Sequence, residues 1–98
     1  MLWCKKHASP KGLILAIADE DLMDQTFEEG DFILSVNKFF KGELVETETV
    51  SDMFEAVKII NAVGEEAVSL IIGANLATED IVKRVSGIPH LQVFKINS

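Results

Sequence analysis

The chain has 98 residues, of which 48% are hydrophobic and 26% are charged, and its net charge is −7. A chain of this length buries roughly two-thirds of its unfolded surface in one core, so we expect a single domain over residues 1–98. The negative charge disfavours DNA as a partner, and the apolar runs are too short to span a bilayer.

The first third of the chain predicts a β-hairpin followed by an acidic turn. Residues 2–7 and 13–18 are apolar-leaning runs, and residues 9–12 (SPKG) have the composition of a tight turn. The second run is continuously apolar, which favours a strand covered on both faces. Residues 19–31 are rich in carboxylates and predict a short helical turn that ends at Gly30.

A second hairpin is expected over residues 32–46. Residues 32–40 alternate in the pattern of a half-buried strand, with one face formed by Phe32, Leu34, Val36 and Phe40 and the other by Ser35 and Asn37. Lys41 and Gly42 then form a tight connection to a strand over residues 43–46.

Three helices and a last strand complete the predicted order. A helix over 49–61 begins with a capping box formed by Thr49 and Asp52, and its apolar residues recur at helical spacing. A second helix over 65–76 follows Gly64 and is apolar nearly all round. A third, short helix runs from Thr78 to Ser86, and the last strand covers 90–96, with Leu91 and Val93 on the face opposite to His90, Gln92 and Phe94.

These elements predict an α+β fold with a mainly antiparallel sheet of about five strands. Strands that precede a run of helices favour this class, so the order is β-β-short turn-β-β-α-α-α-β with three helices packed on one face of the sheet. The same arrangement is expected to bring the two chain termini side by side.

No metal site or cofactor is expected. Cys4, His7 and His90 are the only soft or borderline ligands, and residues three apart on a strand point to opposite faces. The acidic segment 19–31 lacks the oxygen spacing of an EF-hand loop and is interpreted as a solvated surface. A single cysteine also excludes an internal disulfide, and the start of the chain has no apolar leader, so a cytoplasmic location is expected.

His7 and His90 form a candidate acid/base or hydrogen-bonding pair. Both are expected at strand ends, and they would lie close together if the first and last strands were neighbours. The alternative is that each imidazole caps a strand end, since the Gly87-Ile88-Pro89 step before His90 is typical of a rigid strand entry.

Five stretches of the chain resemble an archaeal family known as domain of unknown function 424: CKKH (4–7), TFEEGDFILSV (26–36), FFKGE (39–43), NAVGEEAV (61–68) and GIPHLQVF (87–94). The likeness covers almost the whole chain. The positions that match the family's pattern are His7, Phe27, Gly30, Gly42, Glu43, Asn61, Gly64, Glu65 and His90. The resemblance implies a small archaeal cytoplasmic protein and no particular activity.

The leading hypothesis is a non-catalytic binding or adaptor module with a protein partner. Self-association would cover the helix over 65–76, which has no polar side in the sequence. One alternative is a small-ligand or enzyme site built from His7, His90, Asn61, Gly64 and Glu65. The other is an RNA-contacting protein associated with translation, with Trp3, Phe39 or Phe40 for base stacking. Its basic patch would consist of Lys5, Lys6, Lys11, Lys38 and Lys41.

Overall fold

The computed structural model describes residues 1–95 and contains the predicted first hairpin. Strands β1 (Leu2–His7) and β2 (Ile14–Asp19) pair antiparallel along their whole length. The amide of Gly12 donates to the carbonyl of Ser9 at 3.1 Å in the connecting turn. Residues 15–18 of β2 are buried, because the apolar strand lies inside the sheet and is covered on both faces.

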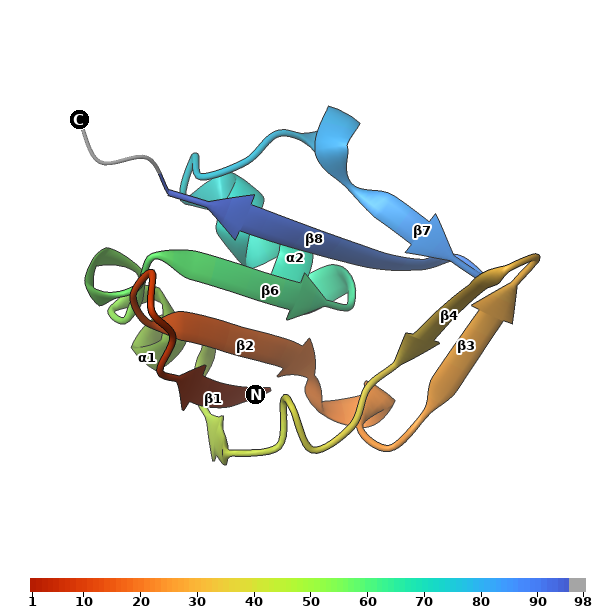
Figure 1. Cartoon of the computed structure of the whole chain (residues 1–98), viewed down its shortest axis with the longest axis horizontal. Helices are drawn as coiled ribbons and strands as arrows, with labels where there is room; N and C mark the ends of the chain where they lie inside the picture. Colours follow the sequence, from red (N-terminus) through yellow and green to blue (C-terminus); the bar gives the residue numbers. More distant parts are fainter. Residues whose placement is uncertain (96–98) are drawn as a thin grey trace.

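Six strands form the main sheet in the order β5-β1-β2-β6-β8-β7 (Figure 1). The four strands not yet defined are β5 (Glu43–Val45), β6 (Ile59–Val63), β7 (Lys83–Val85) and β8 (Ile88–Phe94). Strands β2 and β6 are parallel, and every other neighbouring pair is antiparallel. The fold is therefore α+β with a mostly antiparallel sheet, as expected, but the described residues form eight strands and two α-helices instead of five and three.

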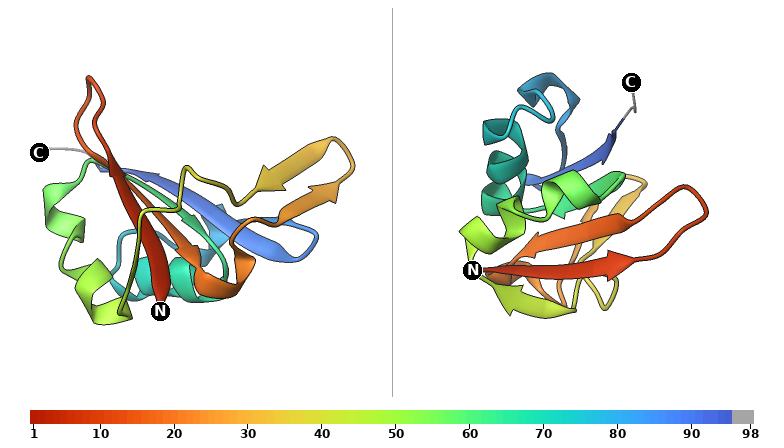
Figure 2. Two further views of the ribbon diagram at one scale, coloured as in Figure 1. Left: turned by 90° about the horizontal axis from the view of Figure 1, so that it is seen from below. Right: turned by 90° about the vertical axis from the view of Figure 1, so that its left-hand side faces the viewer.

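A two-stranded ribbon, here called the arm, replaces the long strand expected over 32–40. It consists of β3 (Thr26–Glu29) and β4 (Phe32–Ser35), and it extends toward the turn between β7 and β8 (Figures 1 and 2). The tip of the arm is held there by Ser86, whose amide donates to the Glu29 carboxylate at 2.7 Å. The expected strand ends early because Asn37 accepts a hydrogen bond from the Phe39 amide and turns the chain.

The helix predicted over 49–61 is wrong in its second half. Helix α1 (Thr47–Ser51) and a single 3-10 turn η2 (Phe54–Ala56) are followed by strand β6 at the centre of the sheet. Helical spacing of apolar residues continued into β6, but Ile59, Ile60 and Val63 are β-branched and favour a strand when it is buried on both faces. The N-cap residue of α1 is Glu46, whose side chain makes no cap hydrogen bond, and Thr49 lies inside the helix, so the expected capping box is wrong.

The later helices are shorter than expected. Helix α2 (Glu65–Gly73) is present, but the third helix consists of one 3-10 turn, η3 (Glu79–Ile81), and its second half is strand β7. Ser86 and Gly87 have positive φ angles of 51° and 80°, which close the hairpin between β7 and β8 in place of a helix end. The last strand starts earlier than predicted, and Ile96 lies outside the described residues.

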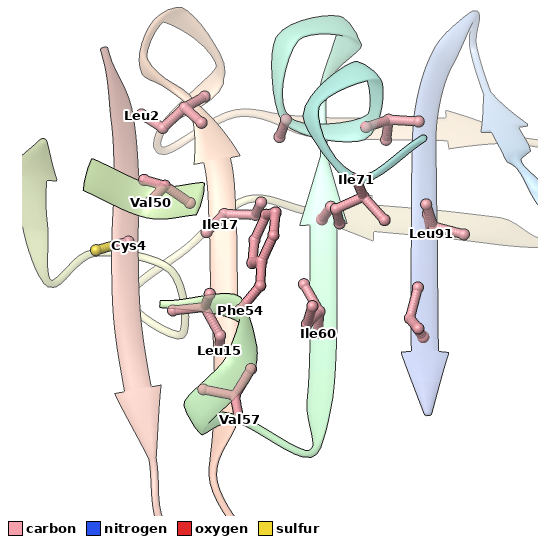
Figure 3. Packing of buried hydrophobic residues seen from close by; sticks show 14 residues of the cluster. Leu2, Cys4, Leu15, Ile17, Val50, Phe54, Val57, Ile60, Ile71 and Leu91 are labelled. Atoms are coloured by element: carbon pink, nitrogen blue, oxygen red, sulfur yellow. The ribbon is translucent and has the colours of Figure 1, made fainter. Parts of the chain in front are cut away.

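Helices α1 and α2 pack on one face of the sheet, and Figure 3 shows the core side chains that lie between the helices and the strands. Val50 and Phe54 lie over Leu15 and Ile17, and Ile71 of α2 lies near Ile60. The opposite face is here called the open face. It carries a second, smaller cluster formed by Ala16, Ala18, Val63, Val36 and Phe40.

The expected side-by-side placement of the two ends is not found within residues 1–95, and residues 96–98 lie outside the described part of the chain. Leu2 pairs with Asp19 at the end of β2, whereas Phe94 pairs with Ile59, which is aligned with the start of β2 at Ile14. Strands β2 and β6 also separate β1 from β8 (Figure 1). The first and last strands are therefore not neighbours.

A contact between Asp19 and Gly64 fixes the start of helix α2. The two carboxylate oxygens of Asp19 accept hydrogen bonds from the amides of Glu66 and Ala67 at 3.1 and 2.8 Å. Gly64 has φ of 109°, and a Cβ atom there would lie 2.2 Å from the Asp19 carboxyl carbon. Glycine is required by both the backbone angle and the space, so this residue lets the carboxylate satisfy the free amides of the helix.

We predict that Gly64→Ala lowers the free energy of unfolding by more than about 2 kcal/mol, because the backbone is strained and the cap is lost. Gly73→Ala is the matched control, since an added Cβ at Gly73 meets nothing within 4 Å. It should be neutral or slightly stabilising. Urea denaturation measures both, and equal stabilities for the two variants would contradict the assigned role of Gly64.

Candidate functional site

Three polar side chains lie together on the open face of β6 and β8. Asn61 pairs directly with Gln92 across the two strands, and His90 pairs with Val63 one position further along the same face. Side chains two residues apart share a face of a strand, so His90 and Gln92 are neighbours on β8. Asn61 and His90, which were both candidate residues, are thus brought together by the sheet.

These residues form the floor of a groove of about 420 Å³. The arm and the loop after it provide one wall, through Leu34 and Phe40, while η3 and β7 provide Ile81 and Lys83 on the other side. The complete lining is Leu34, Phe40, Asn61, Ala62, Val63, Ile81, Lys83, His90, Leu91, Gln92 and Phe94. We refer to this site as the groove.

The charge of the groove differs from that of the whole chain. The described residues that line it include Lys83 and His90 but no carboxylate, hydroxyl or thiol, although the chain carries a net charge of −7. Burial lowers the pKa of His90, and the nearby Lys83 charge lowers it further. Its imidazole is therefore neutral at pH 7, where one ring nitrogen donates and the other accepts a hydrogen bond. Together with two side-chain amides, this donor set suits recognition of polar groups.

His7 lies far from the groove and does not face His90. The register places His7 in a row with Ile14, Ile59 and Phe94, at the other end of the sheet from His90. Two strands lie between β1 and β8, so the two histidines are at least about 14 Å apart across the sheet. The structure therefore does not assemble the candidate acid/base pair.

His7 instead holds the loop that follows the arm. Its Nε2 lies 2.8 Å from the carbonyl oxygen of Phe39, and because that oxygen only accepts, Nε2 is the protonated nitrogen. The imidazole also stacks on the Phe39 ring, with 4.2 Å between ring centroids. The next residue, Phe40, lines the groove, so His7 helps to position this part of the lining through its contacts with Phe39.

Gly64 and Glu65 belong to the corner at the start of α2 and do not line the groove. The Glu65 carboxylate accepts a hydrogen bond from Arg84 at 2.8 Å in an exposed ion pair. The amides of Glu66 and Ala67 are occupied by Asp19, so they are not free to bind an external anion. Burial raises the pKa of Asp19, and these two hydrogen bonds oppose the increase.

Other candidate features have local structural roles. Within residues 1–95, no group of three His, Cys, Asp or Glu side chains is placed to hold a metal ion. Cys4 is buried in the helix-side core, and burial raises the pKa of its thiol. The sequence reasoning predicted that Cys4 and His7 face opposite ways, and Cys4 packs under the helices whereas His7 lies on the open face with Phe39.

The lysine patch is partly assembled around the loop after the arm. The Lys5 ammonium donates to the Lys38 carbonyl at 3.2 Å, and Lys41 pairs with Asp24 at 3.0 Å. The Lys41 ammonium lies over the Trp3 ring, 5.9 Å from the ring centroid. The other two rings already have partners, because Phe40 is buried and Phe39 stacks on His7. Stacking of either ring on a nucleic-acid base would therefore require the loop to rearrange.

Apolar exposure is found on the arm and β8 and not on α2. Ala67, Val68 and Ile71 of α2 are buried against the sheet, so the helix does not present the uncovered face that motivated self-association. The most exposed large apolar residues are Phe32 (71%), Ile33 (67%) and Phe94 (62%).

Gln92 and Lys83 line the groove but were not among the candidate site residues predicted from the sequence. The alternation of the last strand correctly predicted that Gln92 shares a face with His90, and this shared face is the sequence feature that could have identified Gln92 as a site residue. Lys83 was missed because its segment was interpreted as a helix, although it pairs with His90 on the edge strand. Leu34 and Phe40 were expected on one face of a single strand, whereas they reach the groove from the arm and from a loop.

The fold and the groove define a small α+β protein whose mixed sheet is covered by helices on one face and crossed by an arm on the other. Residues 7–96 match the model of the family described as Protein of unknown function (DUF424), so the chain belongs to that family.

A solved structure has the same fold. It is described as an uncharacterized conserved protein from Methanopyrus kandleri, and the two chains share 26% sequence identity with a TM-score of 0.80. The similarity covers 99% of this chain and 95% of the other. A search of curated proteins found no match. In the part of the chain that the structure describes, no helix is long and apolar enough to cross a membrane.

We predict that His7→Ala lowers the free energy of unfolding by about 1–2 kcal/mol, because it removes one hydrogen bond and one ring stack. The amides of Phe40 and Lys41, which close the turns of the loop, should also exchange faster with solvent. Lys6→Ala is the control, since the neighbouring Lys6 is exposed and its loss should change stability by less than about 0.5 kcal/mol. Unchanged loop exchange in His7→Ala would contradict the supporting role of His7.

Proposed function

We propose that this protein is a non-catalytic binding module that recognises a protein partner through the groove. The observation that carries this proposal is the convergence of Asn61, His90, Gln92 and Lys83 on one cavity whose other lining residues are apolar. A small number of polar groups in an apolar cleft is the usual composition of a recognition site, where the polar groups fix the orientation of the bound group.

The composition of the groove favours binding over catalysis. General acid–base catalysis needs a proton donor and acceptor that reach one substrate, and nucleophilic catalysis needs an activated hydroxyl, thiol or amine. Among the described lining residues, His90 is the one imidazole, and the lining holds no carboxylate, hydroxyl or thiol that could act with it.

The apolar surface around the groove favours a macromolecular partner over a small ligand. Phe94 and Ile81 line the groove and are 62% and 47% exposed. Phe32 is on the same face of the arm as Leu34, since the two residues are two positions apart on β4. Apolar contacts thus extend from the groove onto the arm, and a protein surface is large enough to cover both.

Selection of a phage-displayed library of random dodecapeptides on the immobilised full chain tests this proposal. We expect enriched peptides whose synthetic forms bind the wild-type chain and lose about tenfold or more in affinity with Asn61→Leu, which keeps the volume but removes the amide that the peptide contacts. Lys11→Ala, at an exposed turn outside the groove, is the control and should bind as the wild type does.

Two results would count against a binding module of this kind. One is a library that yields no enriched peptide. The other is enriched peptides that bind Asn61→Leu as tightly as they bind the wild-type chain, because their site would then lie outside the groove.

A further inference from the structure

The outer edge of β8 beside the groove has backbone groups with no partner strand among the described residues. Strand β7 pairs with β8 at Ile88, Pro89 and His90, and because β7 begins at Lys83, opposite His90, it does not extend to Gln92. Within residues 1–95, residues 91–94 of β8 therefore have a neighbouring strand on one side only, which is β6.

The direction of each backbone group follows from the hydrogen bonds of the β6–β8 pair. The Gly64 amide donates to the Pro89 carbonyl at 2.9 Å, and the Lys95 amide donates to the Lys58 carbonyl at 2.8 Å. The backbone N–H and C=O groups at odd-numbered positions of β8 thus point toward β6. Because backbone groups alternate in direction along a strand, the N–H and C=O of Gln92 and Phe94 point outward, away from β6.

This edge lies next to the groove. Gln92 and Phe94 line the groove, and Ile81 and Lys83 line it from the side where β7 begins. An extended segment placed on the edge would therefore have side chains of one parity directed to the open face, among His90, Lys83 and Phe94.

We infer that the partner is an extended polypeptide segment that adds to the sheet as a strand beside residues 91–94 and places an acidic side chain at the groove. This inference rests on the proposed function and specifies the kind of partner that binds at the groove. Outward N–H and C=O groups on a sheet edge match the backbone of another strand, whose hydrogen bonds supply affinity while side-chain pockets supply specificity.

The positive charge of Lys83 favours an acidic side chain in the bound segment. The groove contains Lys83 and no carboxylate among its described lining residues, so an acidic group gains an attractive partner and meets no like charge there. The amides of Asn61 and Gln92 are able to donate to the same carboxylate. An apolar side chain further along the segment would contact Phe94.

The test compares Gln92→Pro with Gln92→Ala in binding of the selected dodecapeptides. Proline removes the outward N–H of residue 92 and leaves the bonds to β6 intact, and proline is tolerated on a sheet edge whose N–H faces solvent. Alanine removes the side chain but keeps the N–H. We expect Gln92→Pro to lower the affinity about tenfold more than Gln92→Ala does.

Two further measurements change the peptide and do not depend on how well Gln92→Pro folds. N-methylation of alternate residues blocks the backbone donors of one edge of the peptide, and one of the two N-methylation frames should abolish binding to the wild-type chain. Replacing the acidic residue of the peptide by its amide should weaken binding to the wild-type chain but not to Lys83→Met, as expected for two groups in direct contact.

Each outcome decides between the alternatives. Peptides that lose affinity with Asn61→Leu but tolerate Gln92→Pro and both N-methylation frames would overturn strand addition and leave the proposed binding module standing. Peptides that are insensitive to all of these changes would overturn both. Concentration-dependent dimerisation of the free chain that Gln92→Pro abolishes would identify a second copy as the occupant of the edge and overturn the partner segment.

Discussion

The hydrogen-bond register of β6 determines both faces of the sheet and the start of α2. This strand pairs with β2 on one side and with β8 on the other, and its register decides which residues face the helices. A shift by one residue would turn Ile60 and Ala62 toward the open face and Asn61 into the core. The end of the same strand delivers Gly64 to Asp19, so the register also sets where α2 begins.

As a result, the two faces of the sheet differ in how far they are covered. Helix α2 is held by its cap and covers the face that carries Ile60 and Leu91, so that face is closed by the protein's own core. The other face is only partly covered, by the arm and by the loop that His7 holds in place. Our proposals for function follow from this asymmetry, because the polar residues of β6 and β8 lie on the side that the fold leaves accessible.

Sequence patterns predicted the parts of the fold that depend on local alternation. The first hairpin, the class of the fold and the two faces of the last strand were confirmed, since each follows from residues that are adjacent or two apart. The helix over 49–61 failed because apolar residues at helical spacing ran into a β-branched strand whose identity depends on β2 and β8. Which strands are neighbours depends on residues far apart in the sequence. For the same reason the sequence left His7 and His90 as a candidate pair and did not predict Lys83 as a groove residue.

The register of β6 and the free edge of β8 can be measured together by NMR hydrogen exchange of the β8 amides in the free 98-residue chain. We expect alternating protection, with Leu91 and Val93 exchanging at least about a hundredfold more slowly than Gln92 and Phe94, because the first two amides point toward β6 and the last two toward solvent. Slow exchange at Gln92 and Phe94 alone would contradict the register of β6, and equally slow exchange at all four positions would contradict the free edge beside the groove.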